Sequence, residues 1–203
     1  MMPEARPRVR VVDDDLETRE LLRGLAESVD LEVEMYGDAA KFLRDFDPSH
    51  PGCLVLDARL HGLSGIEIQQ RLTARKVSVP VIMTTRHGDV ATAVEAMRAG
   101  AFDVVERPLL SNSLLASIRR AVEQDLRRRS SSAESSQIRL CYSRLTERER
   151  DVLRLVAGGL TSKMIAAALG LREKTVEVYR SRIKRKMSAR NSADLARMMN
   201  TIS

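Results

Sequence analysis

The stretch Arg8-Val9-Arg10-Val11-Val12-Asp13-Asp14-Asp15 decides the fold class, because a short run rich in valine ends abruptly in three carboxylates. β-branched residues favour strands, so the acids are expected at the carboxyl end of a strand. A second apolar run, Cys53-Leu54-Val55-Leu56, ends in the same way in Asp57. Two strands with acidic ends predict a polar site at one edge of a sheet.

The chain contains three more strand-like runs, and each of the five runs is followed by an amphipathic stretch with helical spacing. Five β/α units predict an α/β domain with a flavodoxin-like, doubly wound, five-stranded parallel sheet. In such sheets ligands bind outside the carboxyl ends of the strands. The expected strands are 8–12, 31–36, 53–56, 80–84 and 102–105, and the expected helices are 16–28, 38–46, 65–74, 90–99 and 111–126.

The first and third strands are neighbours in this strand order, so Asp13, Asp14 and Asp57 are expected to converge. Packed carboxylates repel one another unless a cation compensates them, and a set of oxygen ligands suits Mg²⁺, or Mn²⁺ in its place. A carboxylate beside such a metal accepts a phosphoryl group as an acyl phosphate. Thr85 and Arg107, which follow the fourth and fifth strands, are expected to contact phosphoryl oxygens. Asp15 is expected only to cap the next helix.

The net charge of +6 conceals two halves of opposite sign. Residues 1–125 hold 16 Lys and Arg against 21 Asp and Glu, a net charge of −5. Residues 126–203 hold 18 against 7, a net charge of +11, which is typical of a polyanion-binding domain. Only six aromatic side chains occur in the chain, and single-strand binding needs clustered aromatics, so duplex DNA is the expected partner.

The composition also marks a boundary between the halves. The stretch Arg127-Arg128-Arg129-Ser130-Ser131-Ser132-Ala133-Glu134-Ser135-Ser136 lacks apolar periodicity, which predicts a flexible tether. We therefore expect a first domain over 1–125, a linker over 126–143 and a second domain over 144–203.

Helical signals dominate the second domain, for which an all-α, four-helix arrangement is expected. Thr146 and Glu149 have the spacing of a capping box, and Gly158-Gly159 ends the helix that they begin. The next helix starts near Thr161 or Ser162 and turns at Gly170; further helices are expected over 173–187 and 192–199. Two helices joined by a tight glycine turn form a helix-turn-helix, whose second helix enters the major groove.

The helix over 173–187 has one apolar stripe, made of Val176, Tyr179, Ile183 and Met187, which predicts its buried face. The opposite face is expected to meet DNA. Its N-terminal part is the candidate for base contacts, and the cations farther along, together with the start of the preceding helix, are candidates for phosphate contacts. The base-contact candidates are Lys174, Glu177, Val178 and Ser181; the phosphate-contact candidates are Thr161, Ser162, Lys163, Arg182 and Arg185; Thr175 is a further DNA-binding candidate.

Residues 1–125 resemble a CheY-like receiver domain of a two-component system, through Val11-Val12-Asp13-Asp14-Asp15, Leu54-Val55-Leu56-Asp57, Thr85 and Arg107-Pro108. Gly52-Cys53-Leu54-Val55 and His87-Gly88-Asp89-Val90 are similar to its FixJ-like branch. The end of the chain resembles the LuxR-type helix-turn-helix of the NarL/FixJ family, through Leu145-Thr146, Gly159-Leu160-Thr161-Ser162-Lys163, Thr175-Val176-Glu177-Val178 and Lys186-Met187.

This resemblance implies a bacterial response regulator that acts as a transcription factor. Asp57 would be the phosphoacceptor, Asp13 and Asp14 would hold the metal, and Arg59 would offer it a backbone carbonyl. A histidine kinase would be the partner of the receiver. The active form would be a homodimer that binds two promoter half-sites, formed through the fourth helix, fifth strand and fifth helix.

Three residues depart from the receiver pattern. The family usually has Lys at Arg107, an aromatic switch residue at Val104 and Pro at His61. They leave open a DNA-binding regulator whose receiver acts without phosphorylation, as a dimerisation or ligand-sensing module. A further alternative is a Mg²⁺-dependent phosphohydrolase. Such an enzyme usually has a second acid two residues after its nucleophile, but Arg59 occupies that position after Asp57. The expectation is therefore a protein that is not an enzyme.

Two features indicate where the protein works. Cys53 and Cys141 have no metal-ligand spacing, which fits a reducing compartment. The chain has no apolar run of the length that a membrane span needs, and its first ten residues lack the apolar core of a signal peptide. A cytoplasmic protein without a membrane partner is expected.

Overall fold

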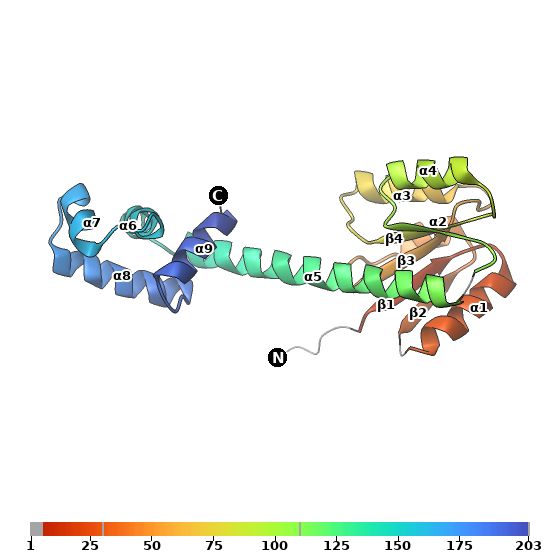
Figure 1. Cartoon of the computed structure of the whole chain (residues 1–203), viewed down its shortest axis with the longest axis horizontal. Helices are drawn as coiled ribbons and strands as arrows, with labels where there is room; N and C mark the ends of the chain where they lie inside the picture. Colours follow the sequence, from red (N-terminus) through yellow and green to blue (C-terminus); the bar gives the residue numbers. More distant parts are fainter. Residues whose placement is uncertain (1–5, 30, 110, 203) are drawn as a thin grey trace. The chain divides into compact units, whose positions relative to one another are not determined.

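The computed structural model describes residues 6–29, 31–109 and 111–202 of the 203-residue chain. The chain divides into two compact units, Met1–Arg129 and Ser130–Ser203. The first contains the sheet, and the second is helical (Figure 1). Among the described helices, none combines the length and the apolar composition that a membrane span requires.

The N-terminal unit is built on a five-stranded sheet with the strand order β2-β1-β3-β4-β5, in which every pair is parallel. This confirms the expected flavodoxin-like fold. The strands are β1 (Arg8–Val12), β2 (Glu32–Tyr36), β3 (Gly52–Asp57), β4 (Val81–Thr85) and β5 (Asp103–Glu106). The helices are α1 (Leu16–Glu27), α2 (Ala39–Asp45), α3 (Gly65–Ala74), α4 (Val90–Arg98) and α5 (Ser111–Ser143).

The sheet buries apolar side chains on both faces, because successive residues of a strand point to opposite sides. In β1, Val9 and Val11 join the core formed with α1 and α5. Val12 instead joins the core formed with α2, α3 and α4. In Figure 1, α1 and α5 accordingly lie on the other side of the sheet from α3.

The register of the sheet determines which side chains meet at its carboxyl edge. Strand β1 pairs with β3 so that Val12 lies opposite Leu56. Asp13 directly follows β1, and Asp57 is the last residue of β3. The two residues are therefore neighbours. Strand β4 pairs with the other side of β3, with Asp57 opposite Thr84.

At the opposite end of β3, a buried carboxylate fixes where the strand begins. Asp125 of α5 is fully buried and accepts a hydrogen bond from the backbone N–H of Gly52 at 3.0 Å. It also accepts hydrogen bonds from the guanidinium groups of Arg128 and Arg129 at 2.5 and 2.6 Å. Only glycine fits at position 52, because φ is +142° and a Cβ there would lie 1.8 Å from the carbonyl oxygen of Arg8.

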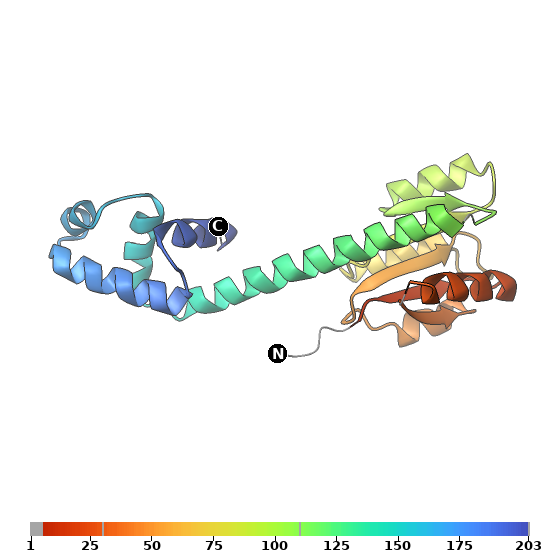
Figure 2. The same cartoon turned by 60° about the horizontal axis from the view of Figure 1, so that its bottom comes forward.

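The C-terminal unit contains α6 (Glu147–Ala157), α7 (Ser162–Leu169), α8 (Glu173–Met187) and α9 (Ser192–Ile202). Thr146 and Glu149 form the expected capping box at the start of α6. Gly170 ends α7 in the left-handed conformation, with φ +64°, and so makes the tight turn into α8 (Figure 2, blue). These helices confirm the expected helix-turn-helix. The end of α5 adds Ile138 and Cys141 to their core.

The structure contradicts the flexible tether. Residues 126–143, expected as a linker, all belong to α5. Polar side chains support the helix here in place of an apolar stripe: Arg127 pairs with Glu123 at 2.6 Å, and the Ser135 hydroxyl donates to the carbonyl of Ser131 at 2.8 Å. Both ends of α5 are packed into a core, so its middle needs only to continue a helix already formed. Apolar periodicity, the signal on which the tether prediction relied, is not required there.

Candidate functional site

The first candidate site is an acidic pocket at the carboxyl edge of the sheet. Asp13, Asp14 and Asp57 each offer a carboxylate oxygen, and these atoms lie within 4.8 Å of one another. Asp13 is buried, and the other two are half-buried. The structure thus brings together the three acids that the sequence predicts. Asp15 caps α1 as expected, accepting hydrogen bonds from the backbone of Glu17 at 3.2 Å and Thr18 at 3.3 Å.

Nitrogen donors of the chain hold the two strand-end carboxylates. Asp13 Oδ1 accepts from the backbone N–H of Asp15 at 2.9 Å, and Asp57 Oδ1 accepts from that of Arg59 at 3.1 Å. The guanidinium of Arg107 donates to Oδ2 of Asp13 and, at 3.1 Å, to Oδ2 of Asp57. Arg107, expected at a phosphoryl oxygen, therefore bridges two of the acids in this structure.

Burial raises the pKa values of both Asp13 and Asp57 above their ordinary values. A backbone hydrogen bond to each carboxylate and the charge of Arg107 act in the opposite direction without outweighing burial. Repulsion from another pocket acid adds to the rise, through Asp57 on Asp13 and through Asp14 on Asp57. Ionising the pocket is costly, so a divalent cation that offsets the charge is favoured there.

The donor set fits a hard divalent cation, since all three acids offer oxygen and oxygen ligands suit Mg²⁺. The start of α3 also packs closely against the end of β3. Gly65, at the start of α3, lies so close to β3 that a Cβ on it would come within 2.3 Å of the carbonyl oxygen of Asp57. That close approach fixes the backbone on which the Asp57 carboxylate is carried.

Thr85 ends β4 as expected, and its buried hydroxyl has no hydrogen-bond partner among the described residues. The buried hydroxyl of the preceding Thr84 is in the same state. A buried hydroxyl without a partner is costly. Thr85 is therefore ready to bond an oxygen atom that arrives at the pocket.

Three residues of the pocket were not among the expected site residues. The Thr18 hydroxyl accepts from Arg107 at 3.0 Å, and Arg19 donates to the backbone carbonyl of Asp13 at 2.6 Å. His61, exposed in the loop after β3, donates its backbone N–H to Asp14 at 3.2 Å and places its imidazole against the same carboxylate. Only His61 gave a sequence signal, as a departure from the family pattern near the site.

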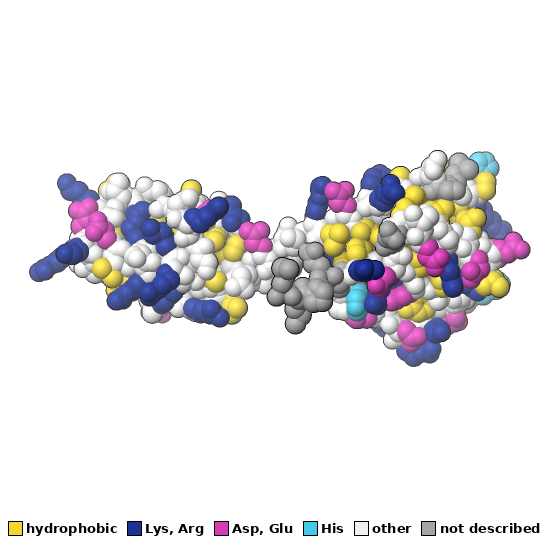
Figure 3. All heavy atoms as spheres, turned by 90° about the horizontal axis from the view of Figure 1, so that it is seen from below, with side chains coloured by type: hydrophobic (Ala, Val, Ile, Leu, Met, Phe, Trp, Pro, Cys, Tyr) yellow, Lys and Arg dark blue, Asp and Glu magenta, His cyan; other side chains and the backbone are white. Residues whose placement is uncertain are grey.

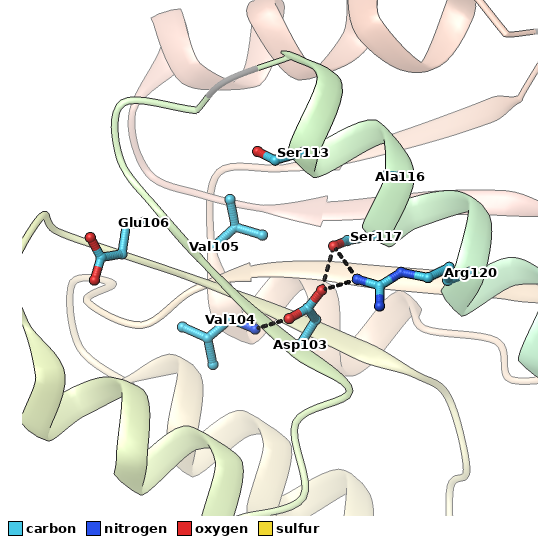
Figure 4. A pocket seen from close by; sticks show the side chains of 8 residues that line it. All are labelled: Asp103, Val104, Val105, Glu106, Ser113, Ala116, Ser117 and Arg120. Atoms are coloured by element: carbon cyan, nitrogen blue, oxygen red, sulfur yellow. Dashed lines mark hydrogen bonds and ion pairs between the residues drawn. The ribbon is translucent and has the colours of Figure 1, made fainter.

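Outside the acidic pocket, a hollow of about 490 Å³ lies between β5 and α5 (Figure 4). Three of its polar side chains, those of Asp103, Ser117 and Arg120, bond one another. The carboxylate of Asp103 accepts from the backbone of Val104 at 2.9 Å, from the Ser117 hydroxyl and from Arg120 at 2.6 Å. Val104, where the resemblance implies an aromatic switch residue, contributes to this lining, and its short side chain packs against the core formed with α2, α3 and α4.

The second candidate site is the outer face of α8. Val176, Ile183 and Met187 are buried and Tyr179 is half-buried, so the expected apolar stripe faces the core. The expected base-contact residues, Lys174, Glu177, Val178 and Ser181, are exposed, and so is Thr175. Figure 3 shows Lys and Arg side chains over this unit with few acidic ones among them.

The expected phosphate contacts are also at the surface. Arg182, Arg185, Thr161 and Lys163 are exposed and Ser162 is half-buried. The Thr161 hydroxyl oxygen accepts from the backbone of Met164 at 3.3 Å as the cap of α7, and its hydrogen remains available to a phosphate. Met164 is also exposed in the first turn of α7, beside these residues. The sequence analysis did not predict an exposed apolar side chain there, because a lone apolar residue in a helix gives no signal.

A parallel sheet with an acidic pocket, followed by a basic helix-turn-helix, defines a receiver joined to a DNA-binding domain. The comparisons agree with this class. Residues 9–119 match the response regulator receiver domain, and residues 143–199 match the bacterial regulatory proteins of the luxR family. The chain belongs to the NarL/FixJ family of response regulators, which are transcriptional regulators.

Full-length relatives support the assignment. The chain is 41% identical to nodulation protein W of Bradyrhizobium diazoefficiens, over 96% of this chain and 86% of the relative. It is 40% identical to the transcriptional regulatory protein FixJ of Azorhizobium caulinodans, over 97% and 93%. Among solved structures, the response regulator StyR matches with a TM-score of 0.86 and 41% identity, over 97% of this chain and 99% of that one.

Proposed function

We propose that phosphorylation of Asp57 controls the binding of this regulator to promoter DNA. The observation that carries the proposal is the cluster of Asp13, Asp14 and Asp57, at the sheet edge of a chain whose other unit exposes a basic helix. A regulator of bacterial promoters works in the cytoplasm, where the DNA is. A histidine kinase or a small phosphodonor supplies the phosphoryl group.

In the proposed reaction, a carboxylate oxygen of Asp57 attacks phosphorus, and the bond from phosphorus to the donor breaks as the donor group leaves. Asp13, Asp14, Asp57 and the backbone carbonyl of Arg59 would hold Mg²⁺, or Mn²⁺ in its place. The metal would supply neutralisation of the charge on the phosphoryl oxygens.

Two further side chains are proposed to bind the acyl phosphate. The unpartnered hydroxyl of Thr85 gains an acceptor when a phosphoryl oxygen arrives. Arg107 keeps its cation within reach of Asp57, at 3.1 Å. A phosphoryl group adds about −1.5 to −2 charges to this pocket, so both contacts favour the phosphorylated form.

In the proposed complex with DNA, α8 lies in the major groove. Lys174 binds guanine acceptors, Glu177 accepts from a cytosine amino group and Val178 contacts a thymine methyl group, with Thr175 and Ser181 beside them. Arg182 and Arg185, with the first turn of α7 (Thr161, Ser162 and Lys163), bind the phosphate backbone.

The active form is proposed to be a homodimer that binds two half-sites. Helix α4 exposes Val90, Val94 and Met97, a row of large apolar side chains on one surface of the receiver. Beside it, Asp103 of β5 and Arg120 of α5 form an ion pair at 2.6 Å. An apolar row with charged groups beside it is suited to a self-complementary contact.

The test is the DNA affinity of the full chain, with and without acetyl phosphate and Mg²⁺. The operator comes from selection on a pool of randomised duplexes. We expect phosphodonor to tighten binding and to label the protein, and Asp57→Asn to abolish both effects. Labelling that persists in Asp57→Asn would place the acceptor elsewhere.

The alternative is a regulator that binds DNA without phosphorylation. The bridge from Arg107 to Asp13 and Asp57 favours it, because the pocket already contains a cation. Specific DNA binding of equal strength with and without phosphodonor would establish this alternative. A phosphohydrolase is not favoured: Arg59, where a second acid would stand, pairs with Asp89 at 2.6 Å. Steady turnover of a phosphate ester would reverse that view.

A further inference from the structure

Arg107 binds three groups of the pocket with one guanidinium. Its Nη2 donates to Asp13 and Asp57, while Nη1 donates to the hydroxyl of Thr18 at 3.0 Å. The side chains of Asp13 and Asp57 are 2% and 14% exposed, and that of Arg107 is 25% exposed. The cation is thus held largely out of solvent between one buried and one half-buried acid.

Thr18 is itself fixed from the other side. Its hydroxyl donates its single hydrogen to Oδ2 of Asp15 at 2.6 Å, so the oxygen lone pairs remain for Arg107. Asp15 is in turn held by the backbone of the first turn of α1. The position of the guanidinium is therefore set in part by the start of α1, through Thr18.

Both carboxylate oxygens of Asp13 are already occupied. Oδ1 accepts from the backbone of Asp15 at 2.9 Å, and Oδ2 accepts from Arg107. A guanidinium holds its donors in a rigid plane, so one nitrogen can bind Thr18 while another binds the acids. The family resemblance implies a lysine at this position. Its ammonium group carries all its donors on one nitrogen, so it cannot bind Thr18 through one nitrogen and the acids through another.

We propose that Arg107, oriented by Thr18, is the resident cation of the metal-free pocket, and that a divalent cation binds only by displacing Arg107 from Asp13. The proposal rests on the function proposed above in one respect, that these acids form the metal site. Thr18 is a positioning residue in this account. Its role is to raise the cost of moving the guanidinium away, which weakens metal binding.

The experiment measures Mg²⁺ affinity of the unphosphorylated full chain by isothermal titration calorimetry. Arg107→Lys and Thr18→Val are each expected to bind Mg²⁺ more tightly, by about fivefold or more, the lower end of typical coupling between two sites. Arg86→Lys is the matched control, because it makes the same charge-conserving change at a cation that acts on Asp57 through its charge. We expect its Mg²⁺ affinity to equal that of the unmodified chain.

A second experiment measures thermal stability, first without metal and then with it. In EDTA, Arg107→Met is expected to melt at a lower temperature than the unmodified chain, because Asp13 and Asp57 lose their cation. Saturating Mg²⁺ is expected to raise the melting temperature of Arg107→Met more than that of the unmodified chain. Equal melting temperatures of the two proteins in EDTA would overturn the proposal.

The outcomes separate this inference from the proposed function. If Arg107→Lys and Thr18→Val bind Mg²⁺ no more tightly than the unmodified chain, Arg107 is not a competitor and the inference fails, whatever phosphorylation does. If both variants bind more tightly but phosphodonor never changes DNA affinity, the inference stands and the phosphorylation control fails. Thr18→Val leaves the residue at position 107 unchanged, so it remains informative if a substitution of Arg107 prevents folding.

Discussion

The Nζ of Lys186, in the last turn of α8, lies 2.6 Å from the Oε2 of Glu149, in the first turn of α6. The Glu149 side chain is 4% exposed, and the same oxygen accepts from the backbone N–H of Thr146 at 2.8 Å. One buried carboxylate therefore closes the capping box of α6 and ties this helix to the helix proposed to bind DNA.

Glu149→Gln is expected to destabilise the C-terminal unit by about 1–3 kcal/mol, because the change leaves Lys186 without its counter-ion and weakens the cap. Hydrogen exchange of the full chain, resolved on peptides from α6 and α8, measures the loss of protection. Glu147→Gln is the control, since Glu147 is exposed in the same turn. Equal loss of protection in both variants would show that the buried pair has no special role.

The pair of Glu149 and Lys186 also predicts that the stability of the C-terminal unit depends on pH. Burial acts to raise the pKa of Glu149, but hydrogen bonds from Lys186 and Thr146 outweigh it and lower the pKa below the ordinary 4.5. The unfolded chain then binds this proton more tightly than the folded chain does. The contribution to stability is complete above pH 4.5 and is lost as the pH falls below that value. The Glu149→Gln variant should lack this component of the acid transition of the C-terminal unit.

Asp125 is predicted to anchor the N-terminal unit. Asp125→Asn removes the buried charge that pairs with Arg128 and Arg129, and we expect a loss of about 2–4 kcal/mol of stability. Urea unfolding of the full chain, followed by exchange at peptides from β3, measures it. Glu123→Gln breaks only an exposed ion pair with Arg127 and should change nothing measurable. Similar effects of the two variants would contradict the anchor.

Thr85 is predicted to favour only the phosphorylated form. Thr85→Val replaces a buried, unpartnered hydroxyl with a methyl group, so we expect the stability of the unphosphorylated protein to stay equal or rise. Labelling by acetyl phosphate should persist, while the gain in DNA affinity on phosphorylation shrinks about fivefold or more, the value of one hydrogen bond. Thr84→Val is the matched control and should leave this gain intact. If Thr85→Val shows the same gain in DNA affinity on phosphorylation as the unmodified chain, Thr85 has no role in that response.

The two halves of α8 are predicted to serve different purposes. Lys174→Ala should reduce sequence preference, by about 1–3 kcal/mol at one base pair, because its exposed ammonium is placed to bind guanine. Arg185→Ala should weaken binding to all duplexes alike and flatten the salt dependence by about one unit. Fluorescence anisotropy against matched and mismatched duplexes at several salt concentrations separates the effects. Equal loss of sequence preference in Lys174→Ala and Arg185→Ala would contradict the assignment of base contacts to one half of α8 and phosphate contacts to the other.

Sequence patterns predicted most of the helices and strands of this protein because their signals are local. The apolar run before Asp13, the run before Asp57 and the spacing of Thr146 and Glu149 each depend on a few adjacent residues. The buried stripe of α8 follows from helical geometry alone. The alternation of strands and helices predicts a parallel, doubly wound sheet, the flavodoxin-like strand order expected for it is the one observed, and in that order the three acids converge.

The tether prediction failed for a related reason. The stretch from Arg127 to Ser136 has no apolar periodicity, yet it is helical. A helix packed at both ends needs no stripe in its middle, and packing at a distance leaves no mark in the segment itself.

The sequence by itself determined the two units, their folds and the acids and cations available to each. Only the tertiary structure decided which of these groups touch: Arg107 with Thr18 and Asp13, Glu149 with Lys186, and Asp125 with Gly52. The physical reason is that a hydrogen bond requires atoms within about 3 Å. For partners dozens of residues apart, that distance is set by how whole elements pack and not by the residues between them.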